Sequence, residues 1–152
     1  MLMRHLRAVT ATALAACVGG IVLLPTPAQA AGSVHISKIY YDSPGRDTRT
    51  NASLNAEYVQ IRNTTRAAVS LKDWSVTDGS NHRYVFGAFT LGKGKTVTIR
   101  TGKGTNNATT RYQGRTNYVW NNDRDTATLK RASGSKADTC SYNSTRVDST
   151  NC

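Results

Sequence analysis

A β-strand is indicated most clearly by Glu57-Tyr58-Val59-Gln60-Ile61-Arg62-Asn63. In this stretch the apolar Val59 and Ile61 alternate with residues that tolerate water. In a β-strand, successive side chains point to opposite faces, so Val59 and Ile61 are predicted to face a core and their neighbours the solvent. This alternation is typical of a sheet with one covered face. The chain is therefore predicted to contain a sheet packed against a second layer.

Segments of the same kind occur on both sides of this stretch. Thr, Val, Tyr, Ser and Asn are abundant in them, and no stretch after residue 30 repeats apolar residues at helical spacing. Further strands are predicted at 34–41, with a bulge at Ser37-Lys38, and at 69–76, 84–86, 89–91, 96–100, 118–120, 126–130 and 137–142. The connections are predicted at 43–56 and 101–116, with turns at 78–81, 92–94 and 121–124. Short strands at this spacing favour an all-β, immunoglobulin-like β-sandwich, although a jelly roll or a small barrel has the same composition.

Residues 1–30 have the pattern of a secretory signal peptide. A basic start with Arg4 and Arg7 precedes an apolar run from 8 to 24, and Ala28-Gln29-Ala30 matches a cleavage site. Removal of this leader leaves 31–152 as one secreted domain, bacterial in the style of its leader. A second interpretation is a bacterial lipoprotein, since Leu14-Ala15-Ala16-Cys17 resembles a lipobox. It is disfavoured because the residues after Cys17 stay apolar, whereas a lipoprotein tether is polar.

Cys140 and Cys152 are the two cysteines that remain after cleavage at residue 30. In an oxidising compartment they are predicted to form a disulfide that ties down the C-terminus. A catalytic cysteine is disfavoured, because neither has a histidine near it in the sequence.

The charge is unevenly distributed. The chain has 20 Lys and Arg against nine Asp and Glu, a formal net charge of +11 at pH 7, and two of the arginines lie in the leader. Residues 79–136 hold 11 basic residues and only two acidic ones, Asp123 and Asp125. This one segment therefore carries the whole basic excess of the secreted domain.

Several fragments, in order, resemble the lamin tail domain family. They are Glu57-Tyr58-Val59-x-Ile61-x-Asn63, Trp74-x-Val76-x-Asp78, Tyr84-x-Phe86, Phe89-x-Leu91-x-x-Gly94-x-x-Val97-x-Ile99, Tyr118-Val119-Trp120-Asn121-Asn122 and Asp125-x-Ala127-x-Leu129. The resemblance runs from about residue 34 to 142 and implies an immunoglobulin-like β-sandwich. It also implies a module that occurs in nuclear intermediate-filament proteins and in bacterial secreted or surface proteins. The leader contradicts a nuclear role.

The large apolar residues of these fragments are expected in the core, with Trp74 at its centre. Burial of each such side chain contributes about 1.5–3 kcal/mol. The expected core residues are Val59, Ile61, Trp74, Phe86, Phe89, Val97, Ile99 and Leu129. For Tyr40, Tyr41, Tyr112 and Tyr118, near strand ends, core packing and ligand stacking are both open.

No catalytic or metal site can be assembled from the sequence. Gly87 to Lys93 has the spacing of a phosphate-binding loop, but Gly94 replaces the required Ser or Thr and a strand follows instead of a helix. Asn121, Asn122, Asp123 and Asp125 could suggest calcium, yet Arg124 lies among them, so a plain turn is preferred. His35, His82 and the single Glu57 fit no known catalytic spacing. The chain is predicted to be neither an enzyme nor a cofactor-binding protein.

The basic loops are the remaining candidate site. The candidate polyanion-binding residues are Lys93, Lys95, Lys103, Arg111, Tyr112 and Arg115. If their loops meet at one end of the sandwich, they would bind an anionic cell-envelope or extracellular polymer such as teichoic acid or acidic polysaccharide. Nucleic acid binding through the same loops, a protein-interaction or structural module working through sheet edges, and a merely solubilising surface are the alternatives.

Overall fold

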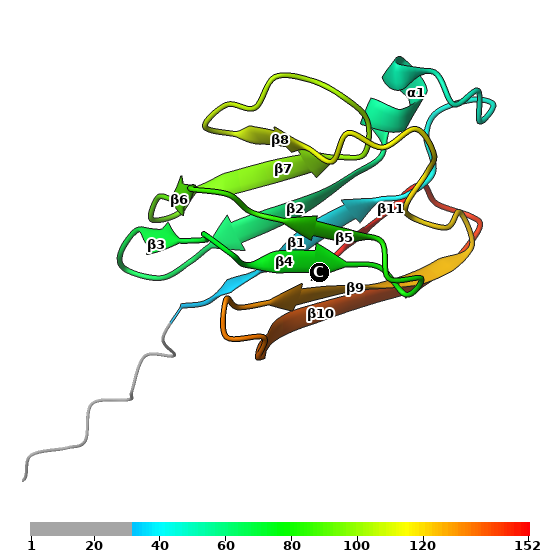
Figure 1. Ribbon diagram of the computed structural model, residues 1–152. Coiled ribbons are helices and arrows are strands. Elements are labelled where there is room, and N and C mark those ends of the chain that lie inside the picture. The colour runs from blue at the N-terminus through cyan, green and yellow to red at the C-terminus, as the bar shows by residue number, and fades with distance from the viewer. Residues whose placement is uncertain (1–31) are drawn as a thin grey trace, which may run out of the picture.

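The computed structural model describes residues 32–152, which form two larger β-sheets, a separate two-stranded pair and a short helix at one end (Figure 1). The larger sheet has the order β11-β1-β2-β7-β8, and the smaller β10-β9-β4-β5. All neighbouring strands are antiparallel except the parallel pair β7–β8. The predicted signal peptide, its cleavage site and Cys17 lie outside the described residues.

The elements have the following bounds. The five-stranded sheet consists of β1 (Val34–Tyr40), β2 (Tyr58–Asn63), β7 (Thr96–Arg100), β8 (Thr110–Tyr112) and β11 (Ser149–Asn151). The four-stranded sheet consists of β4 (Ser75–Thr77), β5 (Arg83–Val85), β9 (Arg124–Lys130) and β10 (Lys136–Asn143). The strands β3 (Val69–Ser70) and β6 (Thr90–Leu91) pair with each other, and α1 spans Asn51–Ala56.

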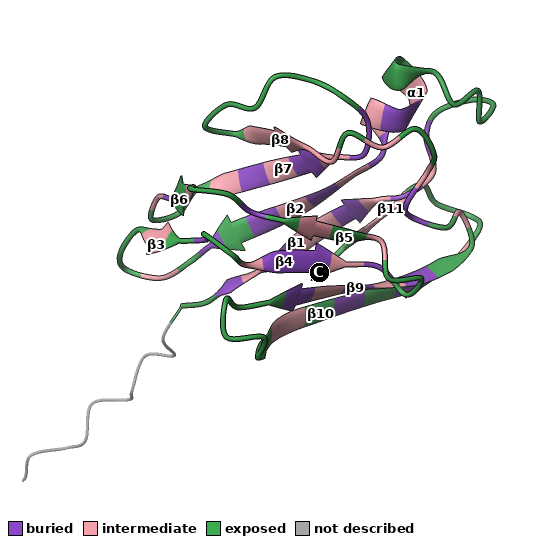
Figure 2. Cartoon of the chain, in the orientation of Figure 1, coloured by how far each residue is buried: buried purple, intermediate pink, exposed green. Residues whose placement is uncertain are grey.

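The two sheets enclose one hydrophobic core. Buried and partly exposed residues alternate along β2 and β7, as Figure 2 shows by colour. Six of the residues expected in the core are buried, namely Val59, Ile61, Phe86, Val97, Ile99 and Leu129. The period-2 pattern of the sequence therefore orients both strands correctly.

The tryptophan at the centre of the core is Trp120, and the expectation for Trp74 needs correction. Trp120 is 2% exposed, whereas Trp74 is only partly buried and packs against the edge of the core together with Phe89. Trp74 precedes β4 and lies beneath the guanidinium of Arg131, 5.8 Å from the ring.

The bulge predicted in the first strand is present between Ile36 and Lys38. The N–H of Ile36 donates to the carboxylate of Asp138 in β10, with 2.8 Å between the nitrogen and Oδ2. Because Asp138 belongs to the other sheet, this bond joins the two sheets along one side.

The predicted disulfide between Cys140 and Cys152 is confirmed, with 5.9 Å between their Cα atoms. It links β10 to the residue that follows β11, so it lies on the same side of the sandwich as the Asp138 contact. The opposite side, formed by β5 and β8, has no covalent closure among the described residues. That side is where the candidate site lies.

Several segments differ from the expected secondary structure. The predicted strand 69–76 is divided between β3 and β4, which belong to different sheets, and β11 was not expected. The connection 43–56 ends in the helix α1, and the loop 101–116 contains β8. Residues 118–120, expected as a strand, form none, because the N–H groups of Val119 and Trp120 donate to the carboxylate of Glu57 and not to a neighbouring strand. No helix in residues 32–152 is long and apolar enough to cross a membrane.

Candidate functional site

The first wall of the site is α1, which holds the loop after β7. Thr50 caps the helix by accepting a hydrogen bond from the N–H of Ser53. The side-chain amides of Asn51 and Asn55 both donate to the backbone oxygen of Lys103, at 3.0 and 2.9 Å. Asn51 also accepts from the Lys103 N–H at 2.7 Å, so this asparagine fixes the Lys103 backbone from both sides.

Gly102 is required for this close approach. A Cβ atom at this position would lie 2.6 Å from Oδ1 of Asn51 and 2.7 Å from Oδ1 of Asn55. Any larger residue would therefore force the two asparagine side chains or the loop to shift, and with them the contacts that hold the Lys103 backbone.

The second wall is the segment that follows β8. The N–H of Gly114 donates to the oxygen of Gly102 at 2.9 Å, and the N–H of Arg115 donates to the oxygen of Thr101 at 2.9 Å. These bonds place Arg115 beside the loop that carries Lys103.

Both walls are joined by the buried carboxylate of Glu57. Its Oε1 accepts hydrogen bonds from the hydroxyl of Thr101 at 2.6 Å and from the N–H groups of Val119 and Trp120 at 2.8 and 3.1 Å. Burial raises the pKa of Glu57 from 4.5 to about 7, although these three hydrogen bonds act in the opposite direction. The only glutamate of the chain is therefore a positioning group for the site.

The walls enclose a pocket of about 370 Å³, which we call the cationic pocket; its lining residues are Arg49, Asn51, Leu54, Lys103, Arg115 and Thr116. Three of the six side chains are cations and none is a carboxylate. Within residues 32–152, none of the three cations forms an ion pair. Such a pocket favours an anionic group, since an anion entering it meets attraction and no like charge.

The structure divides the six candidate residues into separate groups. Lys103 and Arg115 meet in the cationic pocket, whereas Lys93 and Lys95 precede β7 and Lys103 follows it. The two lysine positions therefore lie at opposite ends of that strand. The loops do not all meet at one end of the sandwich, as the sequence interpretation required.

Arg111 and Tyr112 of β8 lie outside the pocket lining. The Arg111 guanidinium stacks over the ring of Phe89, 4.2 Å from its centroid. Tyr112 packs against the backbone of Gly104, where an added Cβ would lie 2.4 Å from the tyrosine ring. Both side chains thus contribute to packing along the β8 edge.

The remaining tyrosines also make packing contacts. Tyr41 is fully buried and stacks on Tyr142, with 3.8 Å between ring centroids. Tyr40 stacks on Tyr58, and the hydroxyl of Tyr118 lies 2.6 Å from that of Ser53 in α1. Tyr118 therefore supports the first wall of the cationic pocket.

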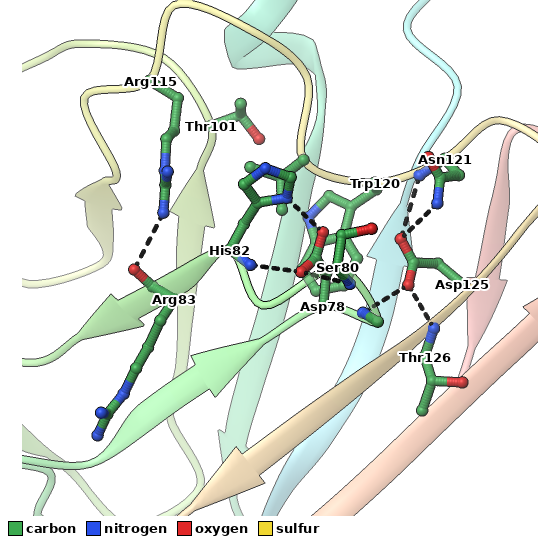
Figure 3. Close-up of polar contacts among 12 residues, drawn as sticks. Asp78, Ser80, His82, Arg83, Thr101, Arg115, Trp120, Asn121, Asp125 and Thr126 are labelled. Atoms are coloured by element: carbon green, nitrogen blue, oxygen red, sulfur yellow. Dashed lines mark hydrogen bonds and ion pairs between the residues drawn. The ribbon is translucent and has the colours of Figure 1, made fainter.

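Three of the carboxylates are used inside the fold. Figure 3 shows Asp78 accepting from the N–H groups of Ser80 and His82 and from the ring of His82, at 3.0, 2.6 and 2.6 Å. It also shows Asp125 accepting from Asn121 and Thr126, and the N–H of Gly79 donates to the same carboxylate at 2.8 Å. Glu57, Asp78 and Asp125 are all buried, so three of the nine acidic residues do not offset the surface cations.

Sequence reasoning missed Arg49, Asn51 and Thr116. They lie in segments read as featureless connections, and Arg49 adopts a left-handed backbone with φ of 55°. Thr50 followed by Asn51 is a recognisable helix start that could have drawn attention to this region. In the part of the chain that the structure describes, no three His, Cys, Asp or Glu side chains are grouped to hold a metal.

The fold and site together define an immunoglobulin-like β-sandwich with a cationic pocket at its open side. The model of the Lamin Tail Domain family matches residues 27–144, which is most of the chain. The protein therefore belongs to the lamin tail domain family, whose sandwich is typically a non-enzymatic module. A search of the curated proteins found no match.

Proposed function

We propose that this lamin tail domain is an extracellular, non-catalytic module that binds an anionic polymer through the cationic pocket. The main support for the proposal is that Arg49, Lys103 and Arg115 all line one pocket, and that no carboxylate lines it. The disulfide between Cys140 and Cys152 supports an oxidising location outside the cell. The predicted leader supports it as well.

The proposal retains two of the residues chosen from the sequence and changes the role of the others. Lys103 and Arg115 contact the ligand, because they line the pocket. Lys93 and Lys95 are exposed on a turn at the other end of β7, where they raise the general positive potential without sharing the pocket.

A charge-reversal comparison tests this assignment. The double variant Lys103→Glu/Arg115→Glu is compared with Lys93→Glu/Lys95→Glu, which has the same net charge. Each is bound to immobilised heparin, a generic polyanion, and eluted with salt. The pocket variant is expected to elute at clearly lower salt than the control variant. Equal elution of the two variants would contradict a pocket and would leave only general charge attraction.

One observation favours a second function, protein interaction through a sheet edge. Val85 in the edge strand β5 is 47% exposed. Its neighbour Phe86 donates its N–H to the oxygen of Trp74, so the N–H and C=O of Val85 point away from β4. A bound protein whose capture is unaffected by salt but abolished by Val85→Pro would support this alternative.

A further inference from the structure

A second carboxylate-free pocket lies on the outer face of the four-stranded sheet. It has a volume of about 350 Å³ and is lined by Thr77, Asn81, Arg83, Lys130 and Gly134. Val76 and Leu129 face the core as cross-strand partners, so the alternation places Thr77 and Lys130 on the opposite face. Arg83 lies opposite Thr77 on β5 and shares that face.

One hydrogen bond of Arg115 connects a lining residue of each pocket. Arg115 lines the cationic pocket, and its Nη2 donates to the backbone oxygen of Arg83 at 3.2 Å (Figure 3). Arg83 in turn lines the second pocket. The cations that line the two pockets are thus linked through the backbone of Arg83, and we call this set the cationic track: Arg49, Lys103, Arg115, Arg83 and Lys130.

Neither pocket carries the groups that would oppose a polyanion or bind a base. None of the lining residues is Asp or Glu, and within residues 32–152 no cation of the track forms an ion pair. None of them is aromatic either, whereas binding of single-stranded nucleic acid relies on stacking between bases and aromatic rings. Three of the five cations are arginines, whose planar fork suits the oxygens of a phosphate group.

We propose that the cationic track binds a linear phosphate polymer that runs from α1 over the β5 edge onto the outer face of the four-stranded sheet. This inference rests on the proposed function and adds the ligand's shape and chemistry. A compact anion occupies one pocket, whereas an extended chain engages both, so affinity should rise with chain length until the track is filled.

The test compares two inorganic probes, tripolyphosphate and long-chain polyphosphate, by isothermal titration calorimetry. The variant Arg83→Ala/Lys130→Ala removes the second pocket's charges. The control Arg124→Ala/Lys136→Ala removes two cations of the same sheet that lie outside the track, and a thermal melt verifies that each variant is folded. For the long chain, the track variant is expected to bind about tenfold more weakly or worse than the control. For tripolyphosphate, the two variants should bind alike.

The outcomes separate this inference from the function on which it rests. If Lys103→Glu/Arg115→Glu weakens binding of long-chain polyphosphate but Arg83→Ala/Lys130→Ala matches its control, the track is refuted and the single pocket stands. If no variant differs from its control, both proposals fail. Equal affinity for polygalacturonate, a carboxylate polymer, would overturn the phosphate assignment. Tighter binding of single-stranded DNA than of polyphosphate would replace it with nucleic acid.

Discussion

Substitution of Glu57 by Gln tests the account of the α1 end of the sandwich most sharply. Glu57 is fully buried and its Oε1 holds Thr101, Val119 and Trp120 together. Glutamine keeps an oxygen acceptor of the same shape for these three donors but does not titrate. The substitution therefore separates the shape of the contact from its charge.

The expected effect follows from the pKa of Glu57, which burial raises from 4.5 to about 7 in the folded protein. The folded state then binds the proton more tightly than the unfolded state, so ionisation opposes folding. Stability that is present below pH 4.5 is lost as the pH rises towards 7. At about 1.36 kcal/mol per pH unit, the difference corresponds to about 3 kcal/mol.

The assay is urea denaturation of both proteins between pH 4 and 8, followed by tryptophan fluorescence. The free energy of unfolding of the wild type, relative to Glu57→Gln, should fall by about 3 kcal/mol over this interval. Asp73→Asn, at an exposed loop position, serves as a control for the loss of a carboxylate outside the core. A wild-type curve parallel to that of Glu57→Gln would refute the burial argument.

The other predictions concern the core, the disulfide and the turn before β5. Trp120→Ala should destabilise the protein by about 3–5 kcal/mol in urea denaturation, and Trp74→Ala by clearly less; similar losses would contradict the placement of Trp120 at the centre. Reduction of the disulfide, which closes a loop of sequence separation 12, should cost about 3 kcal/mol, and an unchanged thermal midpoint under reductant would contradict this. Asp78→Ala should cost about 1–3 kcal/mol, because the bonds to Ser80 and His82 are lost. Faster amide exchange of His82 in this variant would locate the effect, and unchanged exchange would exclude it.

The sheets could largely be predicted because they rest on local patterns. The alternation of apolar and polar residues in 57–63 and 96–100 orients β2 and β7. The bulge after Ile36 follows because the apolar residues of the first strand change there from even to odd positions. The disulfide followed from the compartment and the cysteine count. Each of these inferences needs only neighbouring residues or composition, and the sequence contains both.

The errors concern segments whose structure depends on distant partners. Residues 118–120 have a strand-like composition, yet their N–H groups bind Glu57, more than 60 positions earlier in the chain. Strand β8 is short and polar, and it is a strand because it pairs in parallel with β7 across the intervening loop. Propensity does not encode either contact.

The candidate site was only partly predictable for the same reason. The basic segment was evident from charge counting, but charge counting does not show that β7 separates Lys93 from Lys103. It also does not reveal Arg49, which lies directly before the N-cap of α1 and lines the pocket. The tertiary fold selects which cations meet.

The most direct measurement of the central claim is an NMR titration of the isotope-labelled protein with long-chain polyphosphate. The account predicts that the amide shifts of residues 49–51, 83, 103, 115–116 and 130 change together, while those of 93–95 move little. Changes confined to residues 93–95, or spread evenly over all basic positions, would contradict a cationic pocket shared by Arg49, Lys103 and Arg115.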